Sequence, residues 1–173
     1  MPAAGAPRSM PLFVQVHVAI SLLGIVSGIV VVLGLVANRT LCRWTAFFLA
    51  TTVLTSATGF LLPARHFMPS HAVGIISLVV LAAAIAARYP CRLRGAWRRI
   101  YTISAVTALY LNVFVLIVQL FLKVPALHAL APKGAEPPFA ITQLANLGLF
   151  IVLGVLATLR FKAPLPGGFA TPP

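Results

Sequence analysis

The sequence predicts an all-α polytopic membrane protein, a bundle of five transmembrane helices with the N-terminus outside and the C-terminus inside. Its composition is 61% hydrophobic and 8% charged, against about 45–50% and about 25% in soluble domains. Five apolar runs of 17 to 25 residues contain no proline and no formal charge, and crossing a bilayer takes about 20 helical residues. These runs cover residues 12–36, 44–62, 71–87, 100–122 and 139–159.

Each run carries one stripe of small or polar residues on an otherwise apolar surface, the pattern of helices packed together in a membrane. In the first run, His17, Ser21, Gly24 and Gly28 share a face, and the two glycines would let another helix approach closely. The second and third runs carry hydroxyl and small residues, and the fourth and fifth add amides. Their stripes are Thr51, Thr55 and Thr58; Gly74, Ser77 and Ala84; Ala105, Ala108, Asn112 and Gln119; and Gln143 with Asn146.

The runs predict one transmembrane domain, residues 12–162, between tails at residues 1–11 and 163–173. Its threading follows from the basic residues, because Lys and Arg in short loops stay on the cytoplasmic side. With five spans, the first loop, the third loop and the C-terminal tail share a side and hold nine of the thirteen basic residues. We therefore expect the N-terminus outside and the C-terminus inside.

A cleaved signal peptide is the alternative reading of residues 12–36, with Leu35-Val36-Ala37 as its cleavage site. We favour a retained helix because a signal peptide has an apolar core of only about 7–15 residues. The two cysteines, Cys42 and Cys91, fall in loops on the expected cytoplasmic side. Thiols stay reduced there, which favours two free cysteines over a disulfide.

The third loop combines five arginines with aromatic residues, which favour the headgroup layer of a bilayer. Each basic residue near an anionic leaflet gains about 1 kcal/mol. We expect this loop to anchor the chain and to contact anionic lipid headgroups, while a regulatory lipid or partner site is a less common alternative. The contacting residues are Arg92, Arg94, Trp97, Arg98 and Arg99.

The threading places all four histidines and most of the amides in the outer half, which predicts a polar pocket that opens outward. Asn112 lies midway along its span, where a hydrogen bond inside the bundle explains it better than a ligand does. The pocket residues would be Asn112, Gln119, Gln143, Asn146 and Glu136, the only acidic residue.

The same residues leave two other functions open. A redox or metal protein could hold copper or another metal with His66, His71 and Met68, together with His17 or His128. Alternatively, His17 and His71 could bind haem, or His17 and two glutamines could hold a quinone or lipid headgroup. The spacing matches no established zinc pattern. A channel or carrier for a small neutral solute, lined by Asn112, Gln119, Gln143 and Asn146, is the weaker alternative.

Other activities find no support in the sequence. It has no Asp, and no Glu or Lys within a span, so a carboxylate-based proton relay is not evident. No motif for phosphate binding, metalloprotease activity or a serine nucleophile is present, so we expect no enzymatic activity. The net charge of +12 is scattered over span ends, which favours anionic lipid over nucleic acid as the partner.

Four segments resemble a group of small multispan bacterial inner-membrane proteins of unknown function. They are Pro69–Leu78, Arg94–Tyr101, Leu109–Val115 and Glu136–Phe139, spread over about half of the chain. The resemblance implies a helical fold and a location in the inner membrane, and it assigns no activity or site. We expect a subunit or ligand-binding module that acts as a homo-oligomer or with another membrane subunit.

Overall fold

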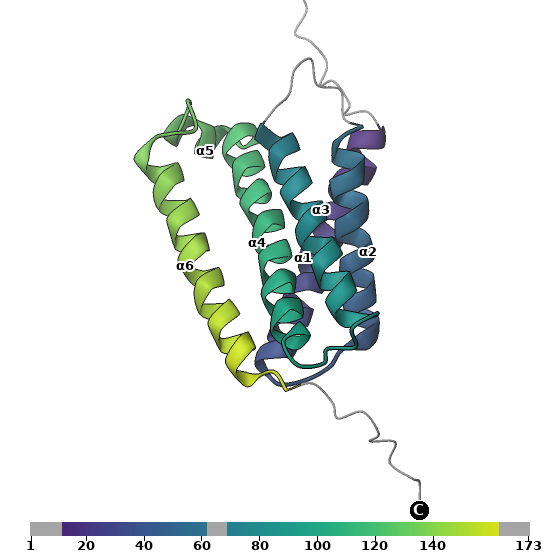
Figure 1. Ribbon diagram of the computed structural model, residues 1–173. Coiled ribbons are helices and arrows are strands. Elements are labelled where there is room, and N and C mark those ends of the chain that lie inside the picture. The colour runs from purple at the N-terminus through teal and green to yellow at the C-terminus, as the bar shows by residue number, and fades with distance from the viewer. Residues whose placement is uncertain (1–11, 62–68, 163–173) are drawn as a thin grey trace, which may run out of the picture.

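The computed structural model describes residues 12–61 and 69–162, and it is helical throughout, with no strand in these two ranges (Figure 1). Five long helices alternate in direction, and one short helix links the last two. The helices are α1 (Leu12–Val36), α2 (Cys42–Gly59), α3 (Pro69–Arg88), α4 (Trp97–Lys123), α5 (Pro125–Leu130) and α6 (Pro137–Arg160).

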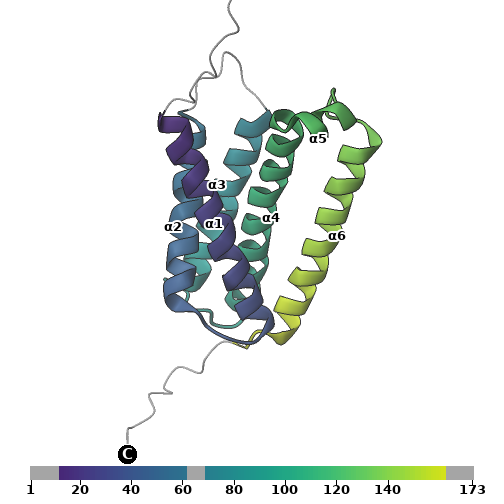
Figure 2. The same cartoon turned by 180° about the vertical axis from the view of Figure 1, so that it is seen from behind.

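Helices α1 to α4 form a bundle, and α6 packs on the outside of this bundle against α4 and α1 (Figures 1 and 2). Within the bundle, α1 packs along α2, and α3 packs along α4. In its most apolar stretch only 11% of the α6 residues are buried, compared with 44% for α1. The fifth long helix is therefore the most loosely held part of the fold.

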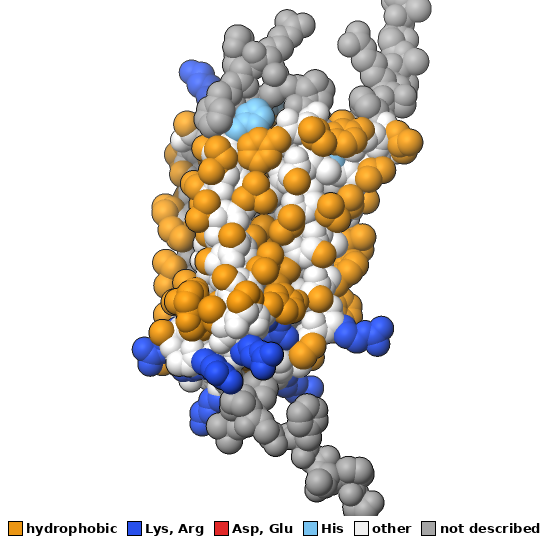
Figure 3. All heavy atoms as spheres, turned by 45° about the vertical axis from the view of Figure 1, so that its right-hand side comes forward, with side chains coloured by type: hydrophobic (Ala, Val, Ile, Leu, Met, Phe, Trp, Pro, Cys, Tyr) orange, Lys and Arg blue, Asp and Glu red, His pale blue; other side chains and the backbone are white. Residues whose placement is uncertain are grey.

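Four of the described helices are long and apolar enough to cross a membrane: α1, residues His71–Arg88 of α3, α4 and α6. Side chains such as Leu12, Val79 and Leu159 are exposed, and Figure 3 shows an apolar band over one face of the molecule. Lipid chains can cover such a band. The second predicted span forms a helix as expected, but α2 is more polar than the other four long helices.

Proline decides where several helices begin. The last predicted run starts at residue 139, whereas α6 begins at Pro137, and the short helix α5, which the sequence did not suggest, begins at Pro125. Proline is well suited to the first turn of a helix, where its missing N–H would have no partner. Proline-rich connections in this chain therefore contain helix starts.

The core lies where α1, α2 and α4 meet. Phe48 and Leu109 are 0% and 1% exposed, and both contact the face of Gly28. The expected close approach at Gly28 is thus made by side chains: a Cβ atom there would lie 2.7 Å from Leu109 Cδ1 and 2.7 Å from Phe48 Cε2.

Hydroxyl groups inside the bundle mostly bond to their own helix. Ser27 donates to the Leu23 carbonyl at 2.7 Å, and Thr51 donates to the Phe47 carbonyl at 2.8 Å. In such bonds, a hydroxyl donates to the carbonyl four residues earlier in its own helix, so it needs no partner from another helix. These hydroxyls can therefore pack at helix contacts without an outside partner, whereas the buried Thr55 hydroxyl has none among the described residues.

The arginine-rich end of the bundle is tied together by side chains. Arg98 of α4 donates to the carbonyl oxygens of Thr158 and Phe161, where α6 ends. Tyr101, only 1% exposed, lies within hydrogen-bond distance of Thr45 and under the guanidinium of Arg88. Arg98 and Tyr101 therefore help to hold this end of the fold, with the Tyr101 ring inside the bundle.

We predict that Gly28→Ala destabilises the fold and that Gly148→Ala does not. Replacing Gly by Ala favours the helical state by about 1 kcal/mol at either position. The two positions differ in their surroundings, because a Cβ at Gly148 meets nothing within 4 Å. Overpacking at Gly28 costs about 1–3 kcal/mol. In detergent, Gly28→Ala should unfold at least about 2 °C below Gly148→Ala. Equal unfolding temperatures would show that the contact at Gly28 is not tight.

Candidate functional site

The histidine candidates in the described residues lie at the end opposite the arginines, and they do not form one cluster. His17 Nδ1 of α1 lies 2.8 Å from the Thr58 hydroxyl of α2. His71 stacks on Phe60, with 5.7 Å between ring centroids, and His128 is exposed on α5. His66 and Met68 lie outside the described residues.

The Thr58 hydroxyl also donates to the Leu54 carbonyl at 2.7 Å, so its single proton has a partner within α2. His17 can then donate from Nδ1 to Thr58, which leaves Nε2 without the proton. This contact joins α1 to α2 near their ends. No group of three metal-ligating side chains occurs among residues 12–61 and 69–162.

The predicted polar-pocket residues in the described part are distributed over different helix contacts. Asn112 donates from Nδ2 to the Thr52 hydroxyl at 3.2 Å, which joins α4 to α2. Gln143 donates from Nε2 to the Phe114 carbonyl at 3.2 Å, which joins α6 to α4. Gln119 is half-buried near the end of α4. Asn112 therefore makes a bond inside the bundle, the arrangement that the sequence favoured over a ligand contact.

Asn146 differs from the other amides because it lines a cavity. The cavity has a volume of about 290 Å³ and lies between α1, α4 and α6. Val32, Leu109 and Phe150 are among its apolar walls. We call it the Asn146 groove.

The Asn146 side chain is 8% exposed, and its Nδ2 has no hydrogen-bond partner among the described residues. One turn earlier on α6, Gln143 Oε1 is also buried without a partner in that part of the chain. An unpaired buried polar group costs about 1–3 kcal/mol. A ligand that offers a hydrogen-bond acceptor to Asn146 would remove this cost.

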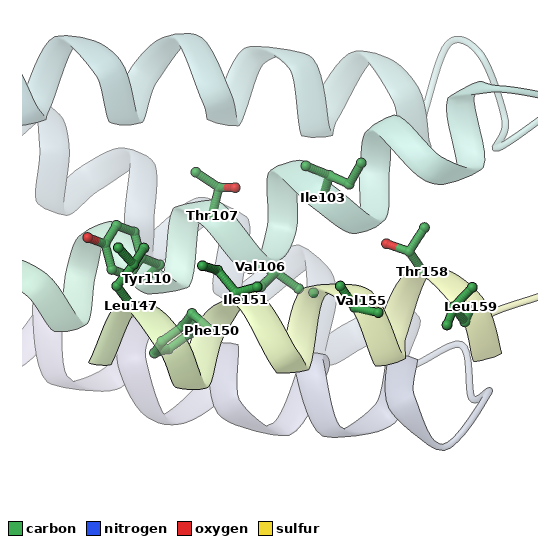
Figure 4. Close-up of a pocket in the computed structure, with 11 residues that line it drawn as sticks. Ile103, Val106, Thr107, Tyr110, Leu147, Phe150, Ile151, Val155, Thr158 and Leu159 are labelled. Atoms are coloured by element: carbon green, nitrogen blue, oxygen red, sulfur yellow. The ribbon is translucent and has the colours of Figure 1, made fainter. Parts of the chain in front are cut away.

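A second, larger cavity lies between α4 and α6, with a volume of about 490 Å³ (Figure 4). Its walls are mainly Val, Leu, Ile and Phe, with Thr158 at the end nearest the C-terminus of α6 and Tyr110 at the other. We call it the α4–α6 groove. Phe150 contributes to both grooves.

Sequence reasoning missed both grooves because they result from how α6 docks. Only Asn146, Phe150 and Ala157 of α6 are buried. These three residues lie on one narrow stripe, at positions i, i+4 and i+11. The composition of α6 does not announce this, since it holds about as many Gly and Ala residues as α1 does.

The arginine-rich loop divides into residues that serve the fold and residues that face outward. Arg98 is half-buried and bonds to the end of α6, whereas Arg92, Arg94, Arg99 and Trp97 are exposed. Figure 3 shows Lys and Arg side chains gathered below the apolar band. The four exposed residues are free to meet lipid headgroups, and Arg98 is committed to the bundle.

Glu136 was expected in the polar pocket, but its carboxylate serves the loop before α6. It accepts hydrogen bonds from the backbone N–H groups of Lys133 and Ala135, both at 3.0 Å. These bonds favour the charged form, and the one from Lys133 contributes most to lowering the pKa of Glu136. The residue thus stabilises a turn at the helix start.

We predict that the pKa of Glu136 in the folded protein lies below its value in the unfolded chain. A lowered pKa means that the carboxylate stabilises the turn above the unfolded pKa, and that this contribution is lost as the pH falls through the folded pKa. Labelling with ¹³C-glutamate gives one side-chain signal, because this is the only acidic residue. Titration of that signal in micelles and in urea measures both values, and equal values would contradict the prediction.

Comparison with protein-family models, with curated proteins and with solved structures gives no significant match. The likeness to small bacterial inner-membrane proteins therefore stays a prediction. The candidate site rests on the geometry of this chain: two apolar grooves beside α6, one of them with an unpartnered amide.

Proposed function

We propose that this chain is an integral inner-membrane protein with five crossing helices, and that it acts as a non-enzymatic ligand-binding module. Its N-terminus lies outside and its C-terminus in the cytoplasm. The ligand is a membrane-soluble molecule with a carbonyl group, held in the Asn146 groove. The observation that carries this proposal is the buried Asn146 amide that faces a cavity without a partner.

A crossing α2 is supported by how its polar groups are satisfied. In lipid, each unpaired polar group is costly, so a polar helix crosses more readily when most of these groups have partners. The hydroxyls of Thr51 and Thr58 bond to carbonyls of α2, and Thr52 accepts a bond from Asn112. Of the buried hydroxyls of α2, only that of Thr55 has no partner among the described residues. Helix α2 also packs between α1 and α3, which shields its polar face from lipid.

The orientation is supported by the basic residues at the two ends of the bundle. In the described residues, nine lie at the end where α1, α3 and α6 terminate, and Lys123 and Lys133 lie at the other. The positive-inside rule places the richer end in the cytoplasm. The nine are Arg39, Arg43, Arg88, Arg92, Arg94, Arg98, Arg99, Arg160 and Lys162.

The depth of Asn146 indicates which kind of ligand fits. It is nine residues after Pro137, which places it about 14 Å along α6. Half of the hydrocarbon core is about 15 Å, so the amide lies near the bilayer centre. A ligand that reaches it must dissolve in lipid, and a carbonyl is the acceptor that such molecules, among them quinones, carry.

The Asn146 groove is lined by residues of α1, α4 and α6, so the proposed site differs from the outward-opening pocket expected from the sequence. The bond from Asn112 to Thr52 and the local role of Glu136 leave Asn146 as the polar contact for the ligand. We propose entry from the side, through the lipid, because the lining is apolar apart from Asn146.

We predict that Cys42 and Cys91 react on the same, cytoplasmic side. Both are free, Cys42 is exposed and Cys91 is half-buried, and they lie at the arginine-rich end. A membrane-impermeant maleimide should leave both unmodified in intact cells and modify both in inverted vesicles. As a control, Ala129→Cys in a chain without the native cysteines should react in intact cells.

This experiment also tests whether α2 crosses. Two crossing helices, α2 and α3, separate Cys42 from Cys91 in the proposed threading. If α2 stayed on one side while α3 crossed, the two cysteines would react on opposite sides. Labelling of Cys42→Ser and Cys91→Ser separately distinguishes these outcomes, and reaction of either native cysteine from outside would contradict the orientation.

We predict that the protein binds a short-chain alkyl benzoquinone more tightly than an alkylbenzene of the same length. A hydrogen bond within a membrane contributes about 0.6–1.7 kcal/mol, which corresponds to about threefold to fifteenfold in affinity. The purified protein in detergent is titrated with each probe by calorimetry. Asn146→Leu keeps the size of the side chain and should lose the preference.

Gln119→Leu is the matched control, because it removes an amide from α4 that lines neither groove. This variant should keep the preference for the quinone. Equal affinity of the unchanged protein for both probes, or an unchanged preference in Asn146→Leu, would contradict the Asn146 site.

A further inference from the structure

We propose that the α4–α6 groove holds one acyl chain of an anionic phospholipid, and that Arg99 contacts the phosphate of this lipid. The inference rests on the membrane location of the chain and is independent of the Asn146 ligand. One bound lipid would thus occupy a defined position, whereas the sequence suggested only general lipid contacts at the arginine-rich loop.

The groove has the lining that an acyl chain needs. Its volume is about 490 Å³, and its walls are formed by apolar side chains such as Val106, Ile151 and Val155 (Figure 4). Gly154 lies at its floor, where a Cβ atom would reach only Val106 Cγ1, at 3.6 Å. Because Gly154 has no side chain, α6 leaves space in the cavity at this point. A flexible acyl chain from the bilayer can occupy that space.

The length of the groove matches one leaflet. From Leu147 to Leu159 it follows α6 for twelve residues, which is about 18 Å. The hydrocarbon part of one leaflet is about 15 Å thick. An acyl chain with its headgroup at the arginine-rich end would thus end near the bilayer centre, where Tyr110 and Leu147 close the groove.

Charge selects which headgroup fits at the mouth. Arg99 is exposed and lies four residues before Ile103 and eight before Thr107 on α4. This spacing puts it on the same face of α4 as the groove lining, one turn beyond the groove. Arginine forms paired hydrogen bonds with phosphate oxygens, so an anionic phosphodiester fits there.

Two neighbouring residues support the same headgroup position. Arg98 bonds to the carbonyls of Thr158 and Phe161 and holds the end of α6 beside the start of α4. Arg98 is thus a positioning residue, and Arg99 is left for the lipid. The Thr158 side chain lies at the mouth (Figure 4), where its hydroxyl can meet an ester oxygen of the lipid.

The test measures lipid binding to the full chain, delipidated in detergent, by native mass spectrometry. The probes are phosphatidylglycerol and phosphatidylcholine with identical acyl chains. One arginine near an anionic lipid corresponds to about a fivefold change in affinity. The unchanged protein should bind one phosphatidylglycerol about fivefold more tightly than phosphatidylcholine, and Arg99→Gln should remove this preference.

Matched variants separate the site from general effects. Arg39→Gln removes the same charge from the same end but away from the groove, and it should keep the preference. Gly154→Leu fills the groove and should weaken binding of both lipids, whereas Gly148→Leu, on a face of α6 with nothing within 4 Å, should not. Circular dichroism of each variant checks that the helices are retained.

A second measurement uses only the unchanged protein. Phosphatidylglycerol with a diazirine in its acyl chain should crosslink residues 103–110 and 147–159 in preference to the exposed α3 residues Ile75, Ile76 and Val79. Uniform crosslinking over the lipid-facing surface would overturn the proposal. Equal affinity for the two lipids, or equal effects of Arg99→Gln and Arg39→Gln, would also overturn it.

Discussion

The requirement that polar groups find partners away from water governs this structure. Ser27, Thr51 and Thr58 bond to carbonyls of their own helices, while Asn112 bonds to Thr52 across a helix contact. Because these partners lie within the bundle, helices that carry hydroxyl groups can still pack closely in lipid. Three buried side-chain atoms lack a partner among the described residues: Thr55 Oγ1 on α2, and Gln143 Oε1 and Asn146 Nδ2 on α6. Of these three residues, only Asn146 lines a cavity.

The loose attachment of α6 explains why both grooves flank this helix. Phe139 meets Phe121 at the start of α6, with ring centroids 5.3 Å apart, and Arg98 holds the Phe161 carbonyl at its end. Between these two contacts, the Phe150 ring packs against the Tyr110 ring, with 5.8 Å between their centroids. Larger parts of α6 remain uncovered, since a narrow stripe of contacts cannot close the space on both sides. A helix fixed at its ends and middle thus leaves room for ligands on either side.

The two ends of the bundle are held together by different side chains. At one end, Arg98 and Tyr101 make bonds that hold α4 to α6 and α2, and the exposed arginines surround them. At the other end, His17 joins α1 to α2 through Thr58. Arginine therefore makes tertiary contacts in addition to the orienting role that we propose for it. Arg98 makes a tertiary contact because the C-terminal end of α6 lies beside it, and Arg88 because the buried Tyr101 ring does. The described arginines without such a neighbour stay exposed.

The sequence by itself determined that the chain forms long apolar helices, and it located four helices that can cross a membrane, because length and apolar composition suffice for this. The gathering of arginines at one end also followed from the sequence. Only the tertiary structure decided which amide lacks a partner: Asn112 and Asn146 look alike in the sequence, but one faces Thr52 and the other a cavity. Partners between helices depend on how each helix is rotated and docked. A periodic pattern gives the face of a helix and not the neighbour that meets it.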